Sequence, residues 1–310
     1  MSNEQTSDIK QILVIEPEFD GISLEKYLIY HLRYSRRMLT RLKQSPEYVL
    51  RNGVHINLPE AVHAGDVIEL TVKEVTYTLP GIAGSVPIVY EDEDIILYRK
   101  PIDMPIHPSR NHLTDTLANV FTADMQAKGL SLPFRVLNRL DRDTSGLCLC
   151  AKNATAANHL SKQQQDGTLQ KEYTAVLCGR LPCHSGIIEA PIARPDPFYI
   201  ERMVRADGQY AKTAFEVLAQ NDKYTMVRVY LYTGRTHQIR VHFSTIGYPL
   251  AGDTMYSAGK CTDKDLSAHA LCCTSLRFLH PTSGESLVFS IDPRPEMSAL
   301  TAGDESCIYR

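Results

Sequence analysis

The sequence has no tryptophan, no low-complexity tract and no run of about 18 apolar residues, the length that a membrane-spanning helix needs. Its polar N-terminal segment, 1–11, lacks the basic start and the apolar core of a signal peptide. We therefore expect no transmembrane helix and a cytoplasmic location. With 310 residues, 43% of them hydrophobic and 22% charged, the chain has the composition of an ordinary globular protein.

Basic residues are not in excess, because 33 Lys and Arg stand against 36 Asp and Glu, for a formal net charge of -3. This balance excludes a wholly basic protein that coats nucleic acid, but it leaves room for a local basic patch.

The eight cysteines include no C-x-x-C pair. Cys148 and Cys150 are two apart, Cys272 and Cys273 are adjacent, and the others are scattered. Spacing of this kind does not predict a zinc site. In a cytoplasmic chain we expect such cysteines to be buried thiols, with neither disulfides nor a metal.

One segment, 23–51, departs from the acidic balance because it holds seven basic residues and two acidic ones. Leucines recur at helical spacing in 24–32 and again in 39–42, which predicts two short helices packed through their leucine faces. The basic residues that fall away from the second leucine face are Arg36, Arg37, Arg41 and Lys43. Such a row suits phosphate groups, although a merely solvated basic face has the same pattern.

Two short alternating segments, 54–57 and 67–70, follow this pair of helices and the Asn52-Gly53 turn signal. The helix-helix-hairpin order over 20–74 resembles the small RNA-binding domain of the ribosomal-protein-S-four type. The resemblance implies docking to structured RNA through the second helix and its four basic residues. We assign 12–75 to this domain and 76–87, which is interrupted by Pro and Gly, to a linker.

The remaining segment, 88–310, mixes strands and helices without a regular alternation of equal units. Apolar patterns predict helices near 115–121, 153–167 and 236–246 and strands at 95–98, 147–151, 171–179 and 224–232. We therefore predict an α+β fold, in which the small domain precedes a larger one with a mixed, largely antiparallel sheet flanked by helices and loops.

The densest polar cluster, Asn138–Gly146, lies directly before the strand expected at 147–151. Strand ends are rigid and loops expose side chains, so a carboxylate such as Asp141 can be held there in a fixed position. Taken alone, an aspartate in a loop is more often a turn former or an ion-pair partner. Composition does not separate these interpretations.

The string RLDRDTSGL at 139–147 resembles the signature of pseudouridine synthases of the RluA/RluD type, His-Arg-Leu-Asp-x-x-Thr-Ser-Gly-Leu. Other blocks resemble the same family in the same order, namely Lys100-Pro101, KEYTAV at 171–176 and TGRTHQIRVH at 233–242. The matching blocks span 88–295, essentially the whole larger domain. The resemblance implies an RNA pseudouridine synthase, an isomerase that needs no cofactor and acts on structured RNA, ribosomal or transfer. We expect a monomer.

The family's essential carboxylate falls on Asp141. The enzyme must break the bond from ribose to the ring nitrogen, rotate the detached uracil and join ribose to a ring carbon. An ionised aspartate near the sugar can act as nucleophile or as base, and the sequence leaves both roles open. The resemblance places on Arg235 the arginine that pairs with the aspartate, and on Tyr173 the active-site tyrosine, which also fits an inward-facing strand position.

A uridine in folded RNA reaches such a pocket only when it is flipped out of its stack. Arg139 matches the arginine that would fill or support the vacated stack, although a phosphate contact is the blander interpretation. Asn138 stands where the motif has histidine. Either residue can orient the loop by hydrogen bonds, so we predict that this position is not a catalytic base. The other polar residues of the late motif, expected to form structural hydrogen bonds that fix Arg235, are His237, Arg240 and His242.

Three other functions are weaker interpretations of the same residues. A non-catalytic RNA-binding or ribosome-assembly factor on this scaffold has no need for Asp141, Tyr173 and Arg235 together. An RNA methyltransferase would need a Gly-rich cofactor loop, which we do not find. An aspartate-based hydrolase would need a second carboxylate, and none is convincingly placed.

Overall fold

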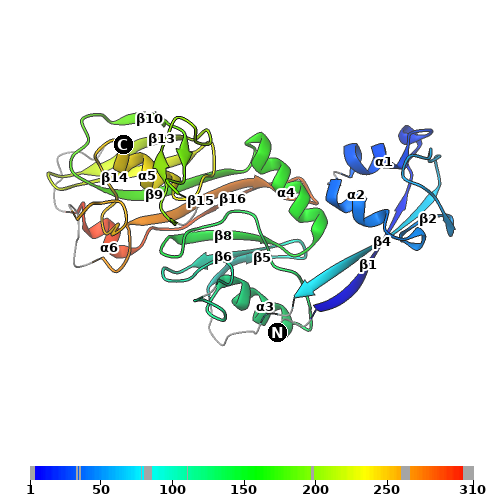
Figure 1. Cartoon of the computed structure of the whole chain (residues 1–310). Helices are drawn as coiled ribbons and strands as arrows, with labels where there is room; N and C mark the ends of the chain where they lie inside the picture. The colour runs from blue at the N-terminus through cyan, green and yellow to red at the C-terminus, as the bar shows by residue number, and fades with distance from the viewer. Residues whose placement is uncertain are drawn as a thin grey trace.

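The computed structural model describes residues 4–32, 34, 36–77, 79, 86–109, 111–196, 199–259 and 266–302, with the backbone alone at 4–9, 36–37 and 72–77. A small N-terminal unit stands at one end of the molecule, and a large sheet runs through the rest (Figure 1). Most of the predicted linker 76–87 lies outside the described residues. Within the described part of the chain, no helix has the length and apolarity to cross a bilayer.

The N-terminal unit is a four-stranded antiparallel sheet covered by short helices. Its strands, in the spatial order β1-β4-β2-β3, are β1 (Glu4–Val14), β4 (Val67–Tyr77), β2 (Val49–Arg51) and β3 (Val54–His55). Its helices are α1 (Leu24–Lys26), which continues as one π-helical turn (Tyr27–His31), and α2 (Arg36–Leu42). The two predicted helices and the hairpin are present, and Leu24, Leu28, Leu39 and Leu42 are buried in the core as expected.

Strand β1 has no counterpart in the sequence-based prediction. It pairs with β4 along its whole length, from Glu4 opposite Tyr77 to Val14 opposite Val67. Its first half is polar and it lies at the sheet edge, so alternation gives little signal there. The long-range partner β4, rather than local sequence, determines this strand.

The large sheet has the spatial order β10-β13-β14-β9-β15-β8-β6-β5. Its strands are β5 (Ile88–Glu91), β6 (Ile95–Lys100), β8 (Ser145–Ala151), β9 (Gln170–Cys178), β10 (Ser185–Glu189), β13 (Lys212–Gln220), β14 (Tyr224–Leu231) and β15 (Leu271–Leu279). Two short strands join it at the sides, β7 (Arg135–Val136) on β8 and β16 (Ser286–Ser290) on β15. The neighbours β8 and β15 run parallel and the other pairs are antiparallel, so the predicted mixed, largely antiparallel sheet is confirmed.

Helices flank this sheet, and a separate hairpin joins β11 (Ile192–Ala193) to β12 (Met203–Val204). The helices are α3 (Leu117–Ala127), α4 (Ala154–Asp166), α5 (Gln238–Thr245) and α6 (Pro295–Ala299). The predicted caps of α4 are present, since the Asn153 side chain accepts the N–H of Ala156 and Gly167 ends the helix with φ 81°. Helix α4 also meets the N-terminal unit, where the Asn158 amide lies against the Met38 sulfur.

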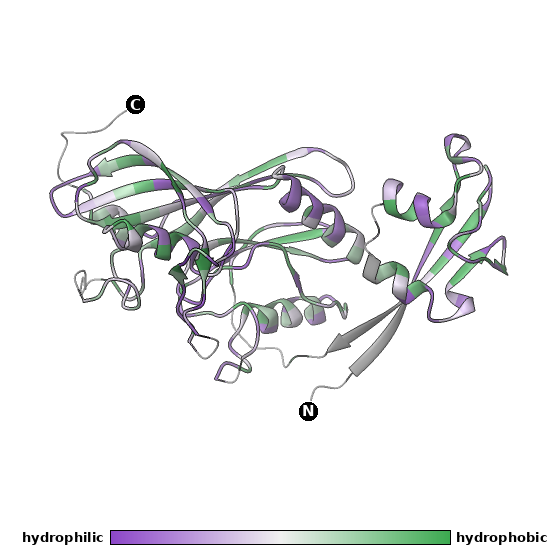
Figure 2. Cartoon of the chain, turned by 45° about the horizontal axis from the view of Figure 1, so that its top comes forward, coloured by the Kyte–Doolittle hydropathy of each residue, from purple (hydrophilic) through white to green (hydrophobic). Residues whose placement is uncertain are grey.

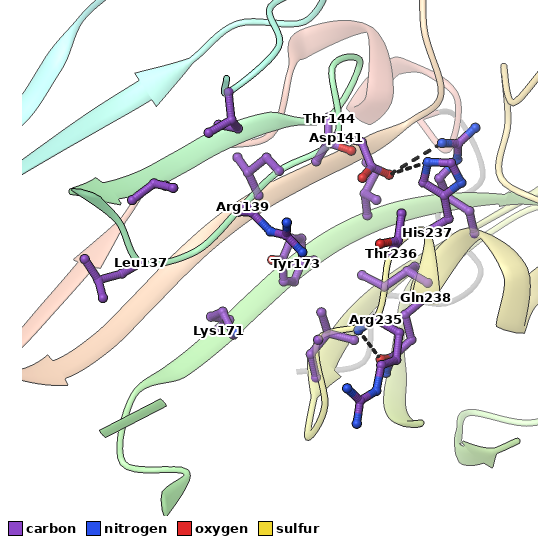
Figure 3. A pocket seen from close by; sticks show the side chains of 18 of the residues that line it. Leu137, Arg139, Asp141, Thr144, Lys171, Tyr173, Arg235, Thr236, His237 and Gln238 are labelled. Atoms are coloured by element: carbon purple, nitrogen blue, oxygen red, sulfur yellow. Dashed lines mark hydrogen bonds and ion pairs between the residues drawn. The ribbon is translucent and has the colours of Figure 1, made fainter. Parts of the chain in front are cut away.

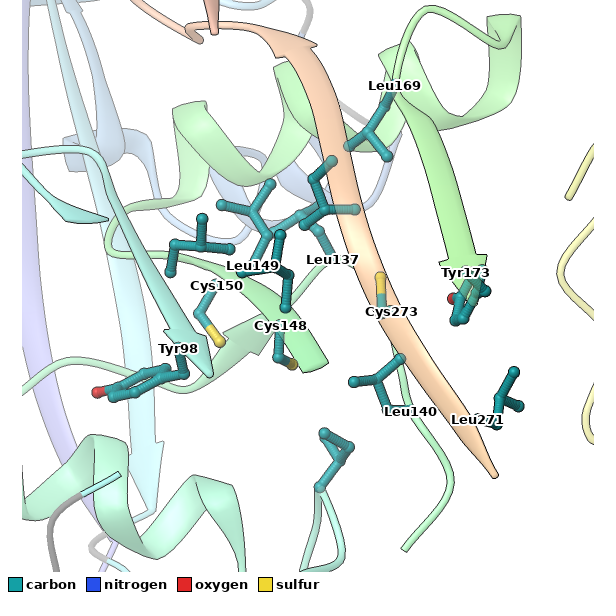
Figure 4. Close-up of a cluster of buried hydrophobic side chains, with 14 of the residues drawn as sticks. Tyr98, Leu137, Leu140, Cys148, Leu149, Cys150, Leu169, Tyr173, Leu271 and Cys273 are labelled. Carbon is teal, nitrogen blue, oxygen red and sulfur yellow. The ribbon is translucent and has the colours of Figure 1, made fainter. Parts of the chain in front are cut away.

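The core of the large sheet centres on β8, all seven residues of which are buried. Hydrophobic colouring runs along the strands and hydrophilic colouring gathers in loops (Figure 2). Cys148, Cys150 and Cys273 lie among the leucines of this core as free thiols (Figure 4). Cys178 differs from the expectation, because it is disulfide-bonded.

Gly146 permits the closest backbone approach in the sheet. It has φ 116°, and a Cβ there would lie 2.3 Å from the carbonyl oxygen of Cys273 on the parallel strand β15. We expect Gly146→Ala to lower the free energy of unfolding by about 2–5 kcal/mol, measured by denaturant titration, because it adds both backbone strain and overpacking. Gly167→Ala is the matched control, since that glycine also has positive φ but has open space around it. An equal loss in both variants would contradict the close-approach argument.

Candidate active site

A cavity of about 440 Å³ lies beside the central strands β14, β9 and β15 of the large sheet, within the size range of small-ligand sites. Three stretches far apart in the sequence form its wall: the loop before β8, the start of β9, and the segment from the end of β14 into α5. Its charged and polar lining residues include Arg139, Asp141, Lys171, Tyr173, Arg235, His237 and Arg240 (Figure 3).

The loop that carries Asp141 is fixed from both sides. Asn138 is buried; its amide nitrogen donates to the Leu147 carbonyl at 2.8 Å, and its amide oxygen accepts the Leu149 N–H at 2.7 Å. The buried Lys100 donates from Nζ to the carbonyls of Pro101, Met104 and Arg142 at 2.8–2.9 Å. Burial lowers the pKa of Lys100 to about 8, because removal from water disfavours the charged ammonium. These bonds hold the backbone in place on both sides of Asp141.

Arg240 holds Asp141 from inside the protein. Its Nη1 lies 3.4 Å from Oδ2 of Asp141, while Nε and Nη2 bind both oxygens of Asp253 at 2.7 and 2.9 Å. The Asp253 side chain is fully buried. Burial alone would lower the pKa of Arg240, but its bonds to Asp253 raise it, so the guanidinium stays charged. A two-point bond to Asp253 therefore aims one positive charge at Asp141.

His237 is the second group that faces Asp141. Its Nε2 lies 3.9 Å from Oδ2 of Asp141 (Figure 3). Its Nδ1 lies 2.7 Å from the hydroxyl of Tyr256. Burial lowers the pKa of His237; the charges of Arg240 and Arg202 act in the same direction, against the attraction of Asp141. The ring is therefore neutral at neutral pH.

Tyr173 lies on β9 with only 5% of its surface exposed, and its ring lines the cavity. Burial raises the pKa of its hydroxyl well above the usual value, and the negative charge of Asp141 adds to this effect. The phenol is therefore protonated at neutral pH, so it can pack on a planar ligand or donate a hydrogen bond. The cavity thus combines an anchored carboxylate, a buried phenol and a rim of cations.

Comparisons with known proteins agree on one family. A sequence model of the RNA pseudouridylate synthase family matches residues 94–245. An uncharacterized RNA pseudouridine synthase of Bacillus subtilis, YjbO, is 37% identical over 275 residues, which are 88% of this chain and 96% of the relative. The chain belongs to the RNA pseudouridine synthase family. It is an isomerase that converts uridine in RNA to pseudouridine, as the sequence motifs predict.

Two further relatives place the chain within this family of synthases. Ribosomal large subunit pseudouridine synthase D of Pasteurella multocida is 33% identical, and the match covers 81% of each chain. The solved structure of human RNA pseudouridylate synthase domain containing 1 superposes with a TM-score of 0.57 at 25% identity, over 71% of this chain and 89% of the human one.

The synthase differs from the prediction in the arginine that meets the aspartate. The partner of Asp141 is Arg240, and Arg235 stands at the other end of the cavity with its side chain pointing away (Figure 3). Its Nε donates to the Tyr210 carbonyl at 3.0 Å. Arg235 precedes α5 in an exposed turn, whereas Arg240 lies within α5 between the buried Ile239 and Val241. Pairing of Asp141 with Arg235 is therefore wrong for this structure.

The other predicted site residues separate into two groups. Arg139 is exposed and lines the cavity. Arg41 and Lys43 belong to the N-terminal unit, where Lys43 pairs with Glu25 at 3.3 Å. The side chains of Arg36 and Arg37 lie outside the described residues. The site residues predicted from the sequence therefore lie in two places, the cavity and the N-terminal unit.

Sequence reasoning gave Arg240 only a supporting role beside Arg235, whereas it faces Asp141, and it missed Asp253 and Tyr256 as parts of the site. One signal could have identified the pairing of Arg240 with Asp253. An arginine between apolar residues of a helix is expected to be buried, and a buried guanidinium needs a carboxylate partner. His242 is fully buried and forms structural hydrogen bonds, but its partners are Thr213 and the Ala190 carbonyl rather than Arg235.

Proposed function

We propose that this synthase modifies a specific uridine of structured RNA, either large-subunit ribosomal RNA or transfer RNA, and that Asp141 is the essential carboxylate. The uridine is flipped out of its stack into the cavity beside Asp141, at a cost of a few kcal/mol. The observation that carries this proposal is the single anchored carboxylate in a cavity walled by Tyr173 and Arg240. A relative named for the ribosomal large subunit supports the ribosomal alternative.

Each wall residue has a role in this proposal. Asp141, held by Arg240, acts at the sugar as nucleophile or as base and offsets positive charge that develops on the ribose while the bond to the ring nitrogen breaks. Tyr173 packs its ring on the detached uracil and keeps it in the cavity while it rotates. Arg139 supports the vacated stack or binds a neighbouring phosphate. Arg235, at the cavity mouth, contacts the RNA rather than the carboxylate.

We infer that the N-terminal unit, assigned to 12–75, is an S-four-like domain that docks on structured RNA, followed by a linker at 76–87 and the catalytic domain at 88–310. The order of two helices and a hairpin, with Arg41 and Lys43 on or beside α2, supports this assignment. The unit stands at one end of the molecule (Figure 1) and meets at Met38 the helix α4, whose Gln164 lines the cavity. It would therefore bind RNA by shape and charge beside the domain that modifies the base.

The proposed activity is tested with the purified full-length protein and no added cofactor. Pseudouridine has the mass of uridine but carries a carbon-carbon glycosidic bond, which a carbodiimide label detects. We expect labelled positions to appear in RNA from cells that lack this protein, after incubation with the enzyme. Sequencing pseudouridines in RNA from cells with and without the protein identifies the position. Identical pseudouridine maps would contradict the proposal.

Neutralising the basic surface should weaken RNA binding in a salt-dependent way. For the Arg41→Gln, Lys43→Gln double variant we expect the slope of log affinity against log salt to fall by about 1–2, because each lost phosphate contact removes about 0.7–0.9. Turnover of a short substrate that contains only the target loop should not change. Lys223→Gln, an exposed lysine of the large sheet, is the control. An unchanged slope would rule out docking through Arg41 and Lys43.

A further inference from the structure

His237 has an unusual backbone conformation for its residue type. It precedes α5 with φ 58° and ψ 18°, in the left-handed region that favours glycine. Such conformations persist where the surrounding structure fixes them, and they gather at functional sites. Its side chain is 9% exposed and lies in the cavity wall. This backbone conformation therefore places the His237 imidazole beside Asp141.

The hydrogen bonds of Tyr256 determine which nitrogen of His237 carries the proton. The Tyr256 oxygen accepts the backbone N–H of Arg202 at 2.8 Å. The hydroxyl proton is then free to be donated to Nδ1 of His237, 2.7 Å away. With Nδ1 as acceptor, a neutral imidazole carries its proton on Nε2. The opposite tautomer would turn the bare lone pair of Nε2 toward the charge of Asp141.

The two oxygens of Asp141 have different surroundings. Oδ2 faces both Arg240 Nη1 at 3.4 Å and His237 Nε2 at 3.9 Å. Among the described residues, no hydrogen bond or ion pair reaches Oδ1. The distance from His237 is long for a hydrogen bond, as is common at catalytic groups before a substrate closes the site. One oxygen is anchored and the other is left for chemistry.

We propose that Tyr256 fixes His237 as the Nε2–H tautomer and that this imidazole, together with Arg240, anchors Oδ2 of Asp141 and leaves Oδ1 to the substrate. The inference rests on the proposed function, in which Asp141 is the reacting carboxylate. His237 and Tyr256 are then positioning residues, since they act through Asp141. A neutral donor suits this task because it orients the carboxylate without adding a second positive charge to neutralise it.

Tyr256 also supports the other anchor of Asp141. The guanidinium of Arg240 lies over the Tyr256 ring, with its carbon 5.0 Å from the ring centroid. Tyr256→Phe keeps this ring contact and removes the hydroxyl alone. The substitution therefore separates the two hydrogen bonds of the hydroxyl, with His237 and with the Arg202 N–H, from the packing that holds Arg240.

The first test combines spectroscopy and turnover on the full-length Tyr256→Phe variant. With ¹⁵N-labelled histidine, long-range ¹H–¹⁵N spectra should show His237 as the Nε2–H tautomer in the natural protein and a mixture in the variant. We expect kcat to fall about 10- to 100-fold, with RNA affinity unchanged, because a misplaced reacting group costs rate more than binding. Tyr98→Phe is the control, since it removes a buried bond to Asp124 at 2.7 Å outside the cavity lining.

A double-mutant cycle separates positioning from general structural support. In His237→Gln the side-chain amide can still offer an N–H to Asp141, but it has no tautomer to fix. We expect Tyr256→Phe to cause no further loss of kcat in this background, whereas independent structural effects would multiply. Full kcat in Tyr256→Phe, or the Nδ1–H tautomer in the natural protein, would overturn the inference. The tautomer of His237 is measured in the natural protein, so this outcome does not depend on the folding of any variant.

The two proposals fail in distinguishable ways. Full turnover by Asp141→Asn would remove the proposed function, whatever Tyr256→Phe does. An inactive Asp141→Asn beside a fully active Tyr256→Phe would remove only the positioning role of Tyr256 and His237.

Discussion

Replacement of Asp141 by asparagine should abolish turnover, with a loss of at least about 10⁴-fold in kcat, and leave RNA binding intact. The amide has the shape of the carboxylate but neither its charge nor its nucleophilicity. Because Arg240 stays paired with Asp253, the fold should persist. Single-turnover pseudouridine formation and RNA affinity are measured on the same preparation. Loss of a negative charge near RNA should not weaken binding.

Asp143→Asn is the matched control for this loss. Asp143 lies two residues further along the same loop, and its carboxylate accepts both Nε and Nη2 of Arg142 at 3.0 Å, outside the cavity lining. We expect turnover near that of the natural protein. Comparable losses in the two variants would mean that the loop, rather than the Asp141 carboxylate, is what the substitutions disturb.

The second large effect is expected at Arg240. In Arg240→Gln the fully buried Asp253 loses its charged partner, so the free energy of unfolding should fall by about 3–5 kcal/mol. Without its anchor Asp141 should also be misplaced, and kcat should fall by about 10²-fold or more. Denaturant titration and single-turnover kinetics measure the two effects separately. Arg240→Lys keeps the charge but lacks the planar fork, so it should recover only part of either loss.

Arg235→Gln provides the comparison that decides between the two arginines. Among the described residues, the Arg235 side chain bonds only the Tyr210 backbone carbonyl. We therefore expect stability and kcat to be retained and KM for RNA to rise. A kcat loss in Arg235→Gln as large as that in Arg240→Gln would restore the pairing that the motif alone predicts. The split between kcat and KM therefore tests the structural assignment.

Much of the fold could be predicted from local signals. The helix at 153–167 has its caps in the sequence, and β8 lies in a continuous apolar run directly after a polar loop. The loop with Asp141 could be identified because its motif is long and because the other motifs of the family occur in the same order along the chain. These features depend on residues that are close together in the chain, so they can be predicted from a single sequence.

The rest depends on contacts between distant segments. The choice between Arg235 and Arg240 is made by Asp253 and by the direction of α5, and neither is visible in a string of ten residues. Strand β1 is determined by β4, more than fifty residues away. Cys178 lies on a strand whose pattern predicts a buried thiol, yet it is disulfide-bonded. Such outcomes follow from tertiary packing, which local pattern does not encode.

The position of β15 in the large sheet has a consequence for the order of events during synthesis. This strand is made late, at 271–279, but it lies between β9 and β8 near the middle of the sheet. A nascent chain that ends before β15 leaves the start of β8, at Ser145 and Gly146, and the facing edge of β9 unpaired. The strand that follows Asp141 is then not joined to the strand that carries Tyr173. We therefore expect the enzyme to modify RNA only after β15 has been synthesised, although most of the chain precedes this strand.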